Sequence, residues 1–310
     1  MVSTDTISPS RQPAAISPRH RFSLGGVALE LLPEPGFVWS LPTETAQHTS
    51  APSDLPKLAA VTCSLRTDPG LVATLSDAPS VRWEQTSDGV CVRARGVVLD
   101  VVALGPRRYV VAARIGHASL LTLMLNTLVT SIAELAGGLC LHATAVAHAA
   151  GAVLLLGPSG AGKTTAAELL GDAVTCLSND RVTLVPDPTE PGKFCVWSLP
   201  IGKAPALSRC PEVSLPLAAL VRIVKAQTPR SMSRITPLRD VEAMLQIRQA
   251  VEVSQGSEQL EPRRLQAVEA LAAAAKSGVA EVALGLPWRA QLEQFLLAEK
   301  SEARVDGMEP

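Results

Sequence analysis

The chain has few aromatic residues and no excess of either charge. Aromatic residues make up only 3% of its 310 residues, whereas hydrophobic residues make up 47%. A core of that size must therefore be built mainly from Ala, Val and Leu. Lys and Arg number 28 and Asp and Glu number 29, so the formal net charge is −1. Without a basic excess or a polybasic run, nothing indicates a nucleic-acid surface or a membrane-surface patch.

The sequence also lacks closely spaced cysteines and a secretory leader. Its six cysteines are scattered and never form C-x-x-C, which argues against a zinc site or disulfide framework and favours reduced thiols. The first 21 residues have no apolar core segment, so we predict no secretory signal. The apolar stretch 118–136 contains Asn126 and Glu134, which predicts a buried amphipathic helix rather than a membrane span. We therefore expect a cytoplasmic protein without membrane or nucleic-acid partners.

The composition changes along the chain and divides it into four parts. Residues 1–20 have the composition of a disordered tail. Residues 21–115 contain short stretches of alternating hydrophobicity separated by turn residues, which indicates a small β-rich N-terminal domain. Residues 116–300 mix strands and helices and carry the chemical motifs, and residues 301–310 form a second tail. The predicted fold class is α/β (α+β).

The most specific motif is the stretch Gly157–Thr164, which matches the P-loop consensus G-x-x-x-x-G-K-[ST]. It follows the apolar run 152–156, which predicts a buried strand, and precedes residues 165–170, which predict a helix that ends at Gly171. Glycines let backbone N–H groups turn towards phosphate oxygens, and a helix N-terminus favours negative charge. The stretch therefore predicts a P-loop core that binds a nucleoside triphosphate; the alternative is a glycine-rich turn without nucleotide.

The residues of this loop have separate expected roles. Lys163 would reach the β- and γ-phosphates, and the Thr164 hydroxyl would help to hold Mg²⁺. The full set expected to bind the nucleotide is Gly157, Ser159, Gly160, Ala161, Gly162, Lys163, Thr164 and Thr165.

Two further polar residues are expected beside the loop. His142 lies on the predicted strand before the P-loop strand, and Asp180 follows Lys163 by 17 positions, at the end of the next strand. Either could be structural, His142 as a core histidine and Asp180 as a turn former. We interpret His142, Lys163 and Asp180 as candidate catalytic residues, and Thr164 and Asp180 as candidate metal ligands.

Together, His142, the loop 157–165 and the pair Asn179–Asp180 resemble the C-terminal domain of HPr kinase/phosphorylase and its HPr-kinase-like relatives. The resemblance implies a mixed β-rich sheet of the phosphoenolpyruvate carboxykinase type and assembly into homo-oligomers. It also implies Mg²⁺-assisted phosphoryl transfer from ATP to a serine or similar hydroxyl. The acidic pair of that family is Asn179–Asp180 here, and an amide cannot act as a base. Asp180 would keep the metal role, with His142 or Asp180 accepting the hydroxyl proton.

Three functions are open from the sequence. The first is an ATP-dependent kinase that transfers the γ-phosphoryl group to a hydroxyl of a protein or peptide substrate. The second is a nucleotide-binding regulator or scaffold whose catalytic site has degenerated, which Asn179 suggests. The third is a small-molecule kinase.

Overall fold

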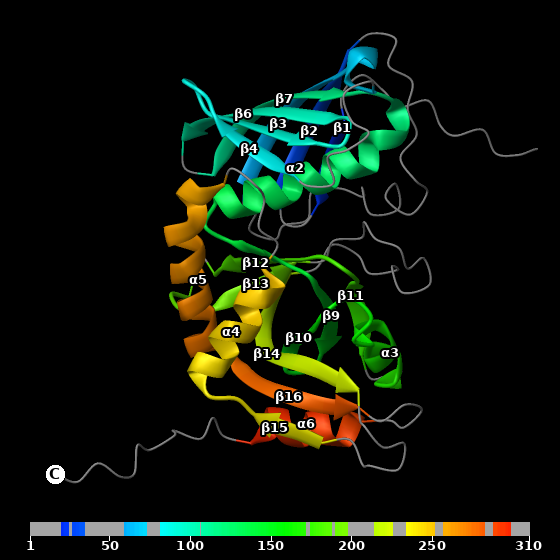
Figure 1. Ribbon diagram of the computed structural model, residues 1–310, viewed down its shortest axis with the longest axis vertical. Coiled ribbons are helices and arrows are strands. Elements are labelled where there is room, and N and C mark those ends of the chain that lie inside the picture. The colour runs from blue at the N-terminus through cyan, green and yellow to red at the C-terminus, as the bar shows by residue number, and fades with distance from the viewer. Residues whose placement is uncertain are drawn as a thin grey trace, which may run out of the picture.

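The computed structural model describes most of the chain between residues 20 and 298. The described ranges are 20–24, 27–34, 59–72, 81–105, 107–171, 174–187, 190–197, 214–225, 234–251, 257–282 and 288–298. Within them the chain forms two β-sheets, one above the other along the long axis, with a single helix running between them (Figure 1). Apart from His20, the two predicted tails lie outside the described ranges.

The first sheet contains the N-terminal strands. These are β1 (His20–Leu24), β2 (Val27–Pro33), β3 (Ala59–Thr67), β4 (Arg82–Gln85), β5 (Val90–Ala94), β6 (Val97–Gly105) and β7 (Arg108–Ile115), with a 3-10 turn at Pro69–Val72. Their order is β1-β2-β3-β7-β6-β5-β4. Strand β3 runs parallel to both of its neighbours and the other pairings are antiparallel. The strand-rich pattern predicted for 21–115 is confirmed over the described part of that region.

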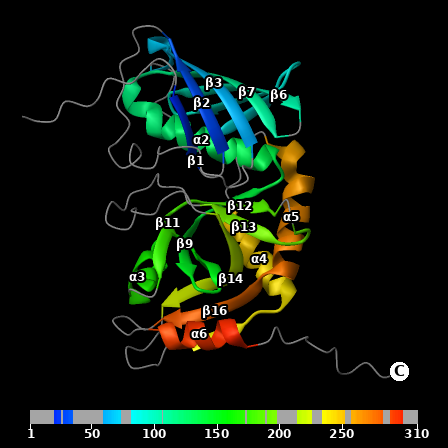
Figure 2. The same ribbon diagram turned by 180° about the vertical axis from the view of Figure 1, so that it is seen from behind.

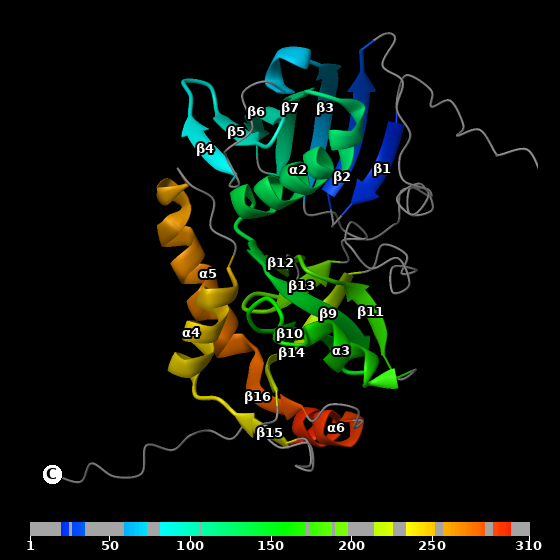
Figure 3. The same cartoon turned by 45° about the vertical axis from the view of Figure 1, so that its right-hand side comes forward.

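Helix α2 (Leu121–Leu135) follows a 3-10 turn at Ala118–Leu120 and covers one face of the first sheet (Figure 3). By length and composition, Ala118–Leu135 could cross a membrane, but 56% of it is buried inside the protein. Its apolar side chains share one core with strands β1 to β7. Residues 118–135 therefore pack as a core helix, and they do so against the first sheet although the predicted domain boundary lies at 115/116.

The end of α2 is fixed by two glycines. Gly137 has φ of +85°, a left-handed conformation that favours glycine, and its N–H bonds to the Glu134 carbonyl. The N–H of Gly138 bonds to the Ala133 carbonyl at 2.8 Å. This pair of bonds is a Schellman motif, and it turns the chain from α2 into the second sheet.

The second sheet contains the remaining strands. These are β8 (Leu139–Leu141), β9 (Ala143–His148), β10 (Gly151–Leu156), β11 (Thr175–Ser178), β12 (Val182–Pro186), β13 (Phe194–Trp197), β14 (Ser214–Lys225), β15 (Arg234–Pro237) and β16 (Lys276–Val282). Strand β14 is parallel to β10 and β16, whereas the other pairings are antiparallel. Both sheets are thus mixed, and the fold is a mixed α/β arrangement of the α+β kind.

The second sheet has two parts that share the long strand β14. One part contains β8, β12, β13 and the first residues of β14, and the other contains β9, β10, β11, β15, β16 and the rest of β14. The chain crosses between the parts at His142, from β8 to β9, and again at 179–181, from β11 to β12. The apolar run 139–147 predicts a single strand, but the chain forms two strands there, separated by a bend at His142.

Within the described ranges, four helices cover this sheet: α3 (Lys163–Glu168), α4 (Asp240–Ala250), α5 (Glu261–Ala274, after a 3-10 turn at Glu258–Leu260) and α6 (Arg289–Leu297). Helices α4 and α5 pack on one face, and α3 and α6 pack on the other (Figures 1 and 2). All six residues of β10 are buried between these layers. The sequence by itself predicts helices near 261–276 and 287–298, and α5 and α6 confirm them, whereas α4 is not predicted.

A buried ion pair joins α2 to α5. Arg264 Nη2 lies 2.6 Å from Glu134 Oε2, and the two side chains are 2% and 5% exposed. Arg264 also donates to the Ser257 hydroxyl and carbonyl. This network ties the helix under the first sheet to a helix that covers the second.

Candidate nucleotide-binding site

The glycine-rich loop 157–164 connects the buried strand β10 to helix α3. Gly157, Gly160 and Gly162 have φ of +146°, +77° and +93°. Residues with side chains rarely adopt such values, so the loop conformation requires glycine at these positions. The Gly162 carbonyl accepts the first helical bond, from Ala166 N–H at 2.8 Å. The strand and the helix predicted on either side of the motif are therefore present, with α3 beginning at Lys163, two residues earlier than predicted.

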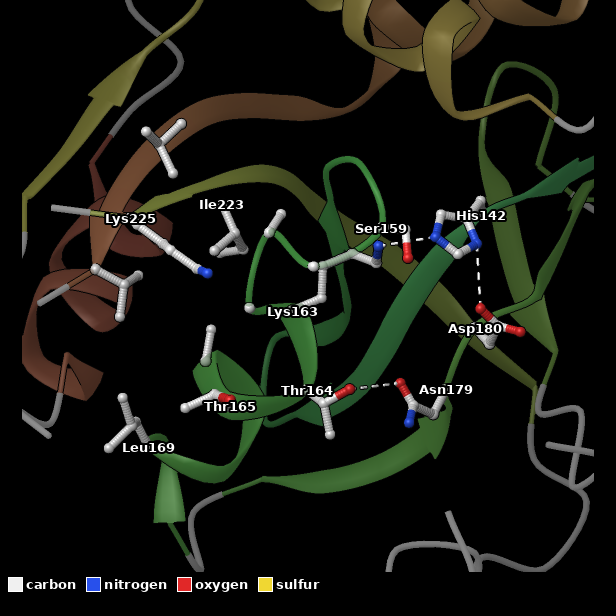
Figure 4. A pocket seen from close by; sticks show the side chains of 16 residues that line it. His142, Ser159, Lys163, Thr164, Thr165, Leu169, Asn179, Asp180, Ile223 and Lys225 are labelled. Carbon is white, nitrogen blue, oxygen red and sulfur yellow. Dashed lines mark hydrogen bonds and ion pairs between the residues drawn. The ribbon is translucent and has the colours of Figure 1, made fainter. Parts of the chain in front are cut away.

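A cavity of about 440 Å³ lies beside this loop. The loop and α3 supply one wall, the turn between β11 and β12 supplies a second, and the ends of β14 and β16 supply a third (Figure 4). The lining residues are His142, Ser159, Gly160, Ala161, Gly162, Lys163, Thr164, Thr165, Ala166, Leu169, Asn179, Asp180, Ile223, Val224, Lys225 and Val282. Apart from Gly157, the first residue of the loop, all the predicted site residues therefore line one cavity.

The Lys163 side chain is 8% exposed and folds back over its own loop. Its Nζ lies 2.8 Å from the Gly157 carbonyl oxygen, 3.2 Å from that of Pro158, and 3.0 Å from His142 Nε2. These three acceptors match the three protons of an ammonium group. Burial lowers the pKa of Lys163 below its usual value, and the nearby Asp180 carboxylate partly opposes this shift.

Asn179 connects the loop to strand β9. Its Oδ1 accepts hydrogen bonds from Thr164 Oγ1 at 3.0 Å and from Thr144 Oγ1 at 2.9 Å. Because the Thr164 proton points to Asn179, the hydroxyl lone pairs remain available on the other side. Thr164, a predicted metal ligand, thus has Asn179 as its hydrogen-bond acceptor.

Asp180 instead pairs with His142. Their side chains meet at 3.2 Å between Oδ1 and Nδ1 (Figure 4). Asp180 has φ of +88°, a left-handed conformation that Asp and Asn tolerate better than other residues with side chains. The bend at His142 is held by its backbone N–H, which bonds at 2.7 Å to the Ala250 carbonyl at the end of α4. The two crossings of the second sheet thus bring these residues together.

These contacts define the tautomer of neutral His142. The ammonium of Lys163 can only donate, so His142 Nε2 must be the acceptor and Nδ1 carries the ring proton. Nδ1–H therefore points to the Asp180 carboxylate. A histidine oriented in this way carries a basic nitrogen, Nε2, on the side of Lys163.

The protein oxygen atoms around Thr164 are too few to hold Mg²⁺ unless a substrate supplies further ligands. Among the described residues, no group of three or more His, Cys, Asp or Glu could hold a metal. Mg²⁺ commonly keeps several waters and binds one or two protein oxygens together with substrate phosphates. The Thr164 hydroxyl and the Asp180 carboxylate, which the sequence suggests as metal ligands, both line the cavity, and their binding of Mg²⁺ stays a prediction.

Lys225 also lines the cavity, although the sequence does not single it out. It is the last residue of β14, which runs beside β10. Leu169, Ile223 and Val282 add an apolar surface at this end of the cavity. The sequence shows a lysine at the end of an apolar strand, but it does not reveal which strand lies beside β10.

The fold and the site define a mixed α/β protein with a glycine-rich loop in a partly polar cavity. A family model described as SynChlorMet cassette protein ScmC matches residues 116–283, which is more than half of the chain. The chain therefore belongs to the ScmC family. The match extends from just before α2 to just after β16, so it includes every residue of the candidate site and leaves out the first sheet. No curated protein matched the chain.

The family match corrects one expectation from the sequence. The resemblance to the HPr kinase/phosphorylase C-terminal domain was wrong, because the matching family is ScmC and no HPr-kinase-like signal was found. A short glycine-rich motif with a few polar neighbours can occur in different families, so it was not sufficient to identify one.

Proposed function

We propose that the protein is an ATP-dependent kinase that transfers the γ-phosphoryl group to a hydroxyl of a protein or peptide. The observation that carries this proposal is the meeting, in one cavity, of the G-x-x-x-x-G-K-T loop with the oriented pair His142–Asp180. The first is suited to holding phosphate and the second to accepting a proton.

On the donor side, the loop and Lys163 would hold the phosphates of ATP. Lys163 Nζ now donates to two loop carbonyls and to His142, so it must give up at least one of these bonds to reach a phosphate oxygen. A charged hydrogen bond to phosphate is stronger than one to a neutral carbonyl, which favours this exchange. Mg²⁺ bound with the nucleotide would neutralise phosphate charge, with Thr164 and Asp180 as its protein ligands.

On the acceptor side, His142 would take the proton of the attacking hydroxyl. The hydroxyl oxygen forms a bond to the γ-phosphorus as the bond from that phosphorus to the β–γ bridging oxygen breaks, and ADP leaves. Release of Nε2 by Lys163 would free a lone pair for the hydroxyl proton, and Asp180 would stabilise the resulting imidazolium. Phosphoryl transfer depends mostly on positioning and charge neutralisation, so a single base is sufficient.

A second candidate is a nucleotide-binding regulator without transfer activity. The supporting observation is Asn179, whose neutral amide oxygen is the hydrogen-bond acceptor of Thr164. A carboxylate in that position would add negative charge next to the proposed Mg²⁺. A small-molecule hydroxyl is the third candidate acceptor.

The experiment is transfer of label from γ-labelled ATP with Mg²⁺ to a panel of Ser-, Thr- and Tyr-containing peptides and small alcohols. We expect transfer by the wild type and a loss of about 10²–10³-fold or more in Lys163→Met, by analogy with removal of a preorganised charge-stabilising donor. Lys193→Met is the matched control, because Lys193 is exposed, pairs with Glu190 and does not line the cavity. Undiminished transfer in Lys163→Met would contradict the mechanism, and ATP binding without transfer or hydrolysis would favour the regulator.

A further inference from the structure

Lys225 lies where a second cation could reach a phosphate chain. Strand β14 runs parallel to β10, and its last residues line the cavity next to the loop that follows β10. A Cβ atom on Gly162 would lie 3.9 Å from Lys225 Cε, so the aliphatic part of Lys225 passes close to the last glycine of the loop. Lys225 thus approaches the loop from the end of the neighbouring strand.

Lys225 and the pair His142–Asp180 lie at opposite ends of the cavity. In Figure 4 the loop runs between them, with Lys225 on the left and His142 on the right. The Cα partner of Lys225 on β16 is Val282, so the apolar residues Val282 and Ile223 belong to the Lys225 end. The cavity therefore has one end suited to acid–base chemistry and another that combines a cation with apolar surface.

The two lysines of the cavity differ in what they contact. Lys163 has an acceptor for each of its three ammonium protons. Lys225 has an exposed side chain, and its ammonium has neither a hydrogen bond nor an ion pair with any residue in the described ranges. The carboxylate that lines the cavity, Asp180, pairs with His142 at the far end. An unpaired ammonium next to a phosphate-binding motif is available for an anionic ligand without breaking an existing bond.

We infer that Lys225 binds the phosphates that stay on the donor nucleotide, so that the γ-phosphoryl group faces His142 and the nucleoside lies towards Val282 and Ile223. This inference rests on the proposed function, because it orients the ATP that the function requires. In this orientation Lys225 neutralises charge that builds up on the ADP leaving group while Lys163 neutralises the transferred group. Lys225 is thus a phosphate-binding residue for the nucleoside diphosphate part of the donor.

The test is ADP binding measured by isothermal titration calorimetry for the wild type, Lys225→Ala, Lys225→Arg and Arg222→Ala. Arg222 is the matched control because it lies on the same strand, three residues earlier, and does not line the cavity. We expect Lys225→Ala to weaken ADP binding about 10- to 100-fold, the range for one lost charged hydrogen bond. Lys225→Arg should stay within about threefold of wild type because it keeps the charge, and Arg222→Ala should be unchanged.

The salt dependence of ADP binding distinguishes a charge on Lys225 that pairs with phosphate from a purely structural role of this residue. The affinity of Lys225→Ala for ADP should fall less steeply between low and high salt than that of the wild type, because one charge pair is missing. If the wild type binds ADP and Lys225→Ala binds it equally well, the inference is overturned and nucleotide binding stands. If the wild type binds neither ADP nor ATP, the proposed function itself fails.

Discussion

His142 Nδ1 lies 3.2 Å from Asp180 Oδ1, and these residues occupy the two points where the chain crosses between the parts of the second sheet. The pair therefore depends on strand pairing over a long stretch of sequence. It orients His142 so that Nε2 accepts from Lys163, which links the proposed base to the proposed phosphate-binding lysine. Several expectations depend on this chain of three side chains.

Asp180→Asn should reduce phosphoryl transfer much more than it reduces ATP binding. Asn tolerates the positive φ of residue 180 and keeps the shape of the side chain, but it loses the charge that stabilises a protonated His142. We expect transfer to fall about 10²–10⁴-fold, the usual contribution of a general base. Asp187→Asn, a carboxylate outside the cavity, is the control. The role of Asp180 would be rejected if transfer stayed at the wild-type rate.

Burial of Lys163 should make stability depend on pH in the alkaline range. The pKa of Lys163 is lowered in the folded protein, so the unfolded chain binds more protons at this residue between the folded pKa and the usual value of 10.5. The free energy of unfolding should therefore rise with pH in that window. We expect this rise to be smaller in Lys163→Met, measured by urea unfolding at a series of pH values. An equal or steeper rise in the variant would be evidence against a lowered pKa of Lys163 in the folded protein.

Asn179→Asp should lower the Mg²⁺ concentration that nucleotide binding requires. The new carboxylate would lie beside Thr164, and a charge pair at about 4 Å contributes on the order of 1 kcal/mol in a watery cavity. The Mg²⁺ concentration for half-maximal ATP binding should then fall about fivefold. Asn179→Ala is the contrast, because it leaves Thr164 and Thr144 without their shared acceptor. A higher Mg²⁺ requirement in Asn179→Asp would disprove this account, whereas a large gain in transfer would indicate a degenerate natural site.

The buried pair Glu134–Arg264 should be important for stability. Removing one partner leaves the other charge buried and unpaired, so Arg264→Met should destabilise the protein by about 3–5 kcal/mol. The double variant Glu134→Leu with Arg264→Met should recover much of that loss. Arg289→Ala, at an exposed i,i+4 pair, should cost about 0.5 kcal/mol or less. Denaturant unfolding measures the free energy of unfolding of all three variants. An Arg264→Met variant as stable as the wild type would refute the prediction.

The parts of the site that are local in sequence could be predicted, and the parts that depend on strand pairing could not. The loop 157–164 and its flanking strand and helix follow from glycines and an apolar run. Neighbouring residues in a turn point in different directions, so the sequence could not show that Asn179 contacts Thr164 while Asp180 contacts His142. Lys225 was missed because its place depends on which strand pairs with β10.

In the fold, too, local features could be predicted from the sequence, and features that depend on contacts between distant segments could not. Strands β4 to β7 were evident from alternating hydrophobicity and turn residues. The bend that divides 139–147 into two strands was not evident, because apolar residues continue on both sides of His142. Helix α4 was not predicted because only three of its eleven residues are buried, so the sequence shows only a weak pattern of apolar residues there.

The most direct test of the central claim is calorimetric titration of Mg²⁺·ATP into the wild type and Lys163→Met. If the cavity beside the loop binds the triphosphate through Lys163, the wild type should bind with a single site. The variant should then bind about 10- to 100-fold more weakly, because one charged hydrogen bond to phosphate is lost. No binding by the wild type, or equal binding by the two proteins, would contradict the account.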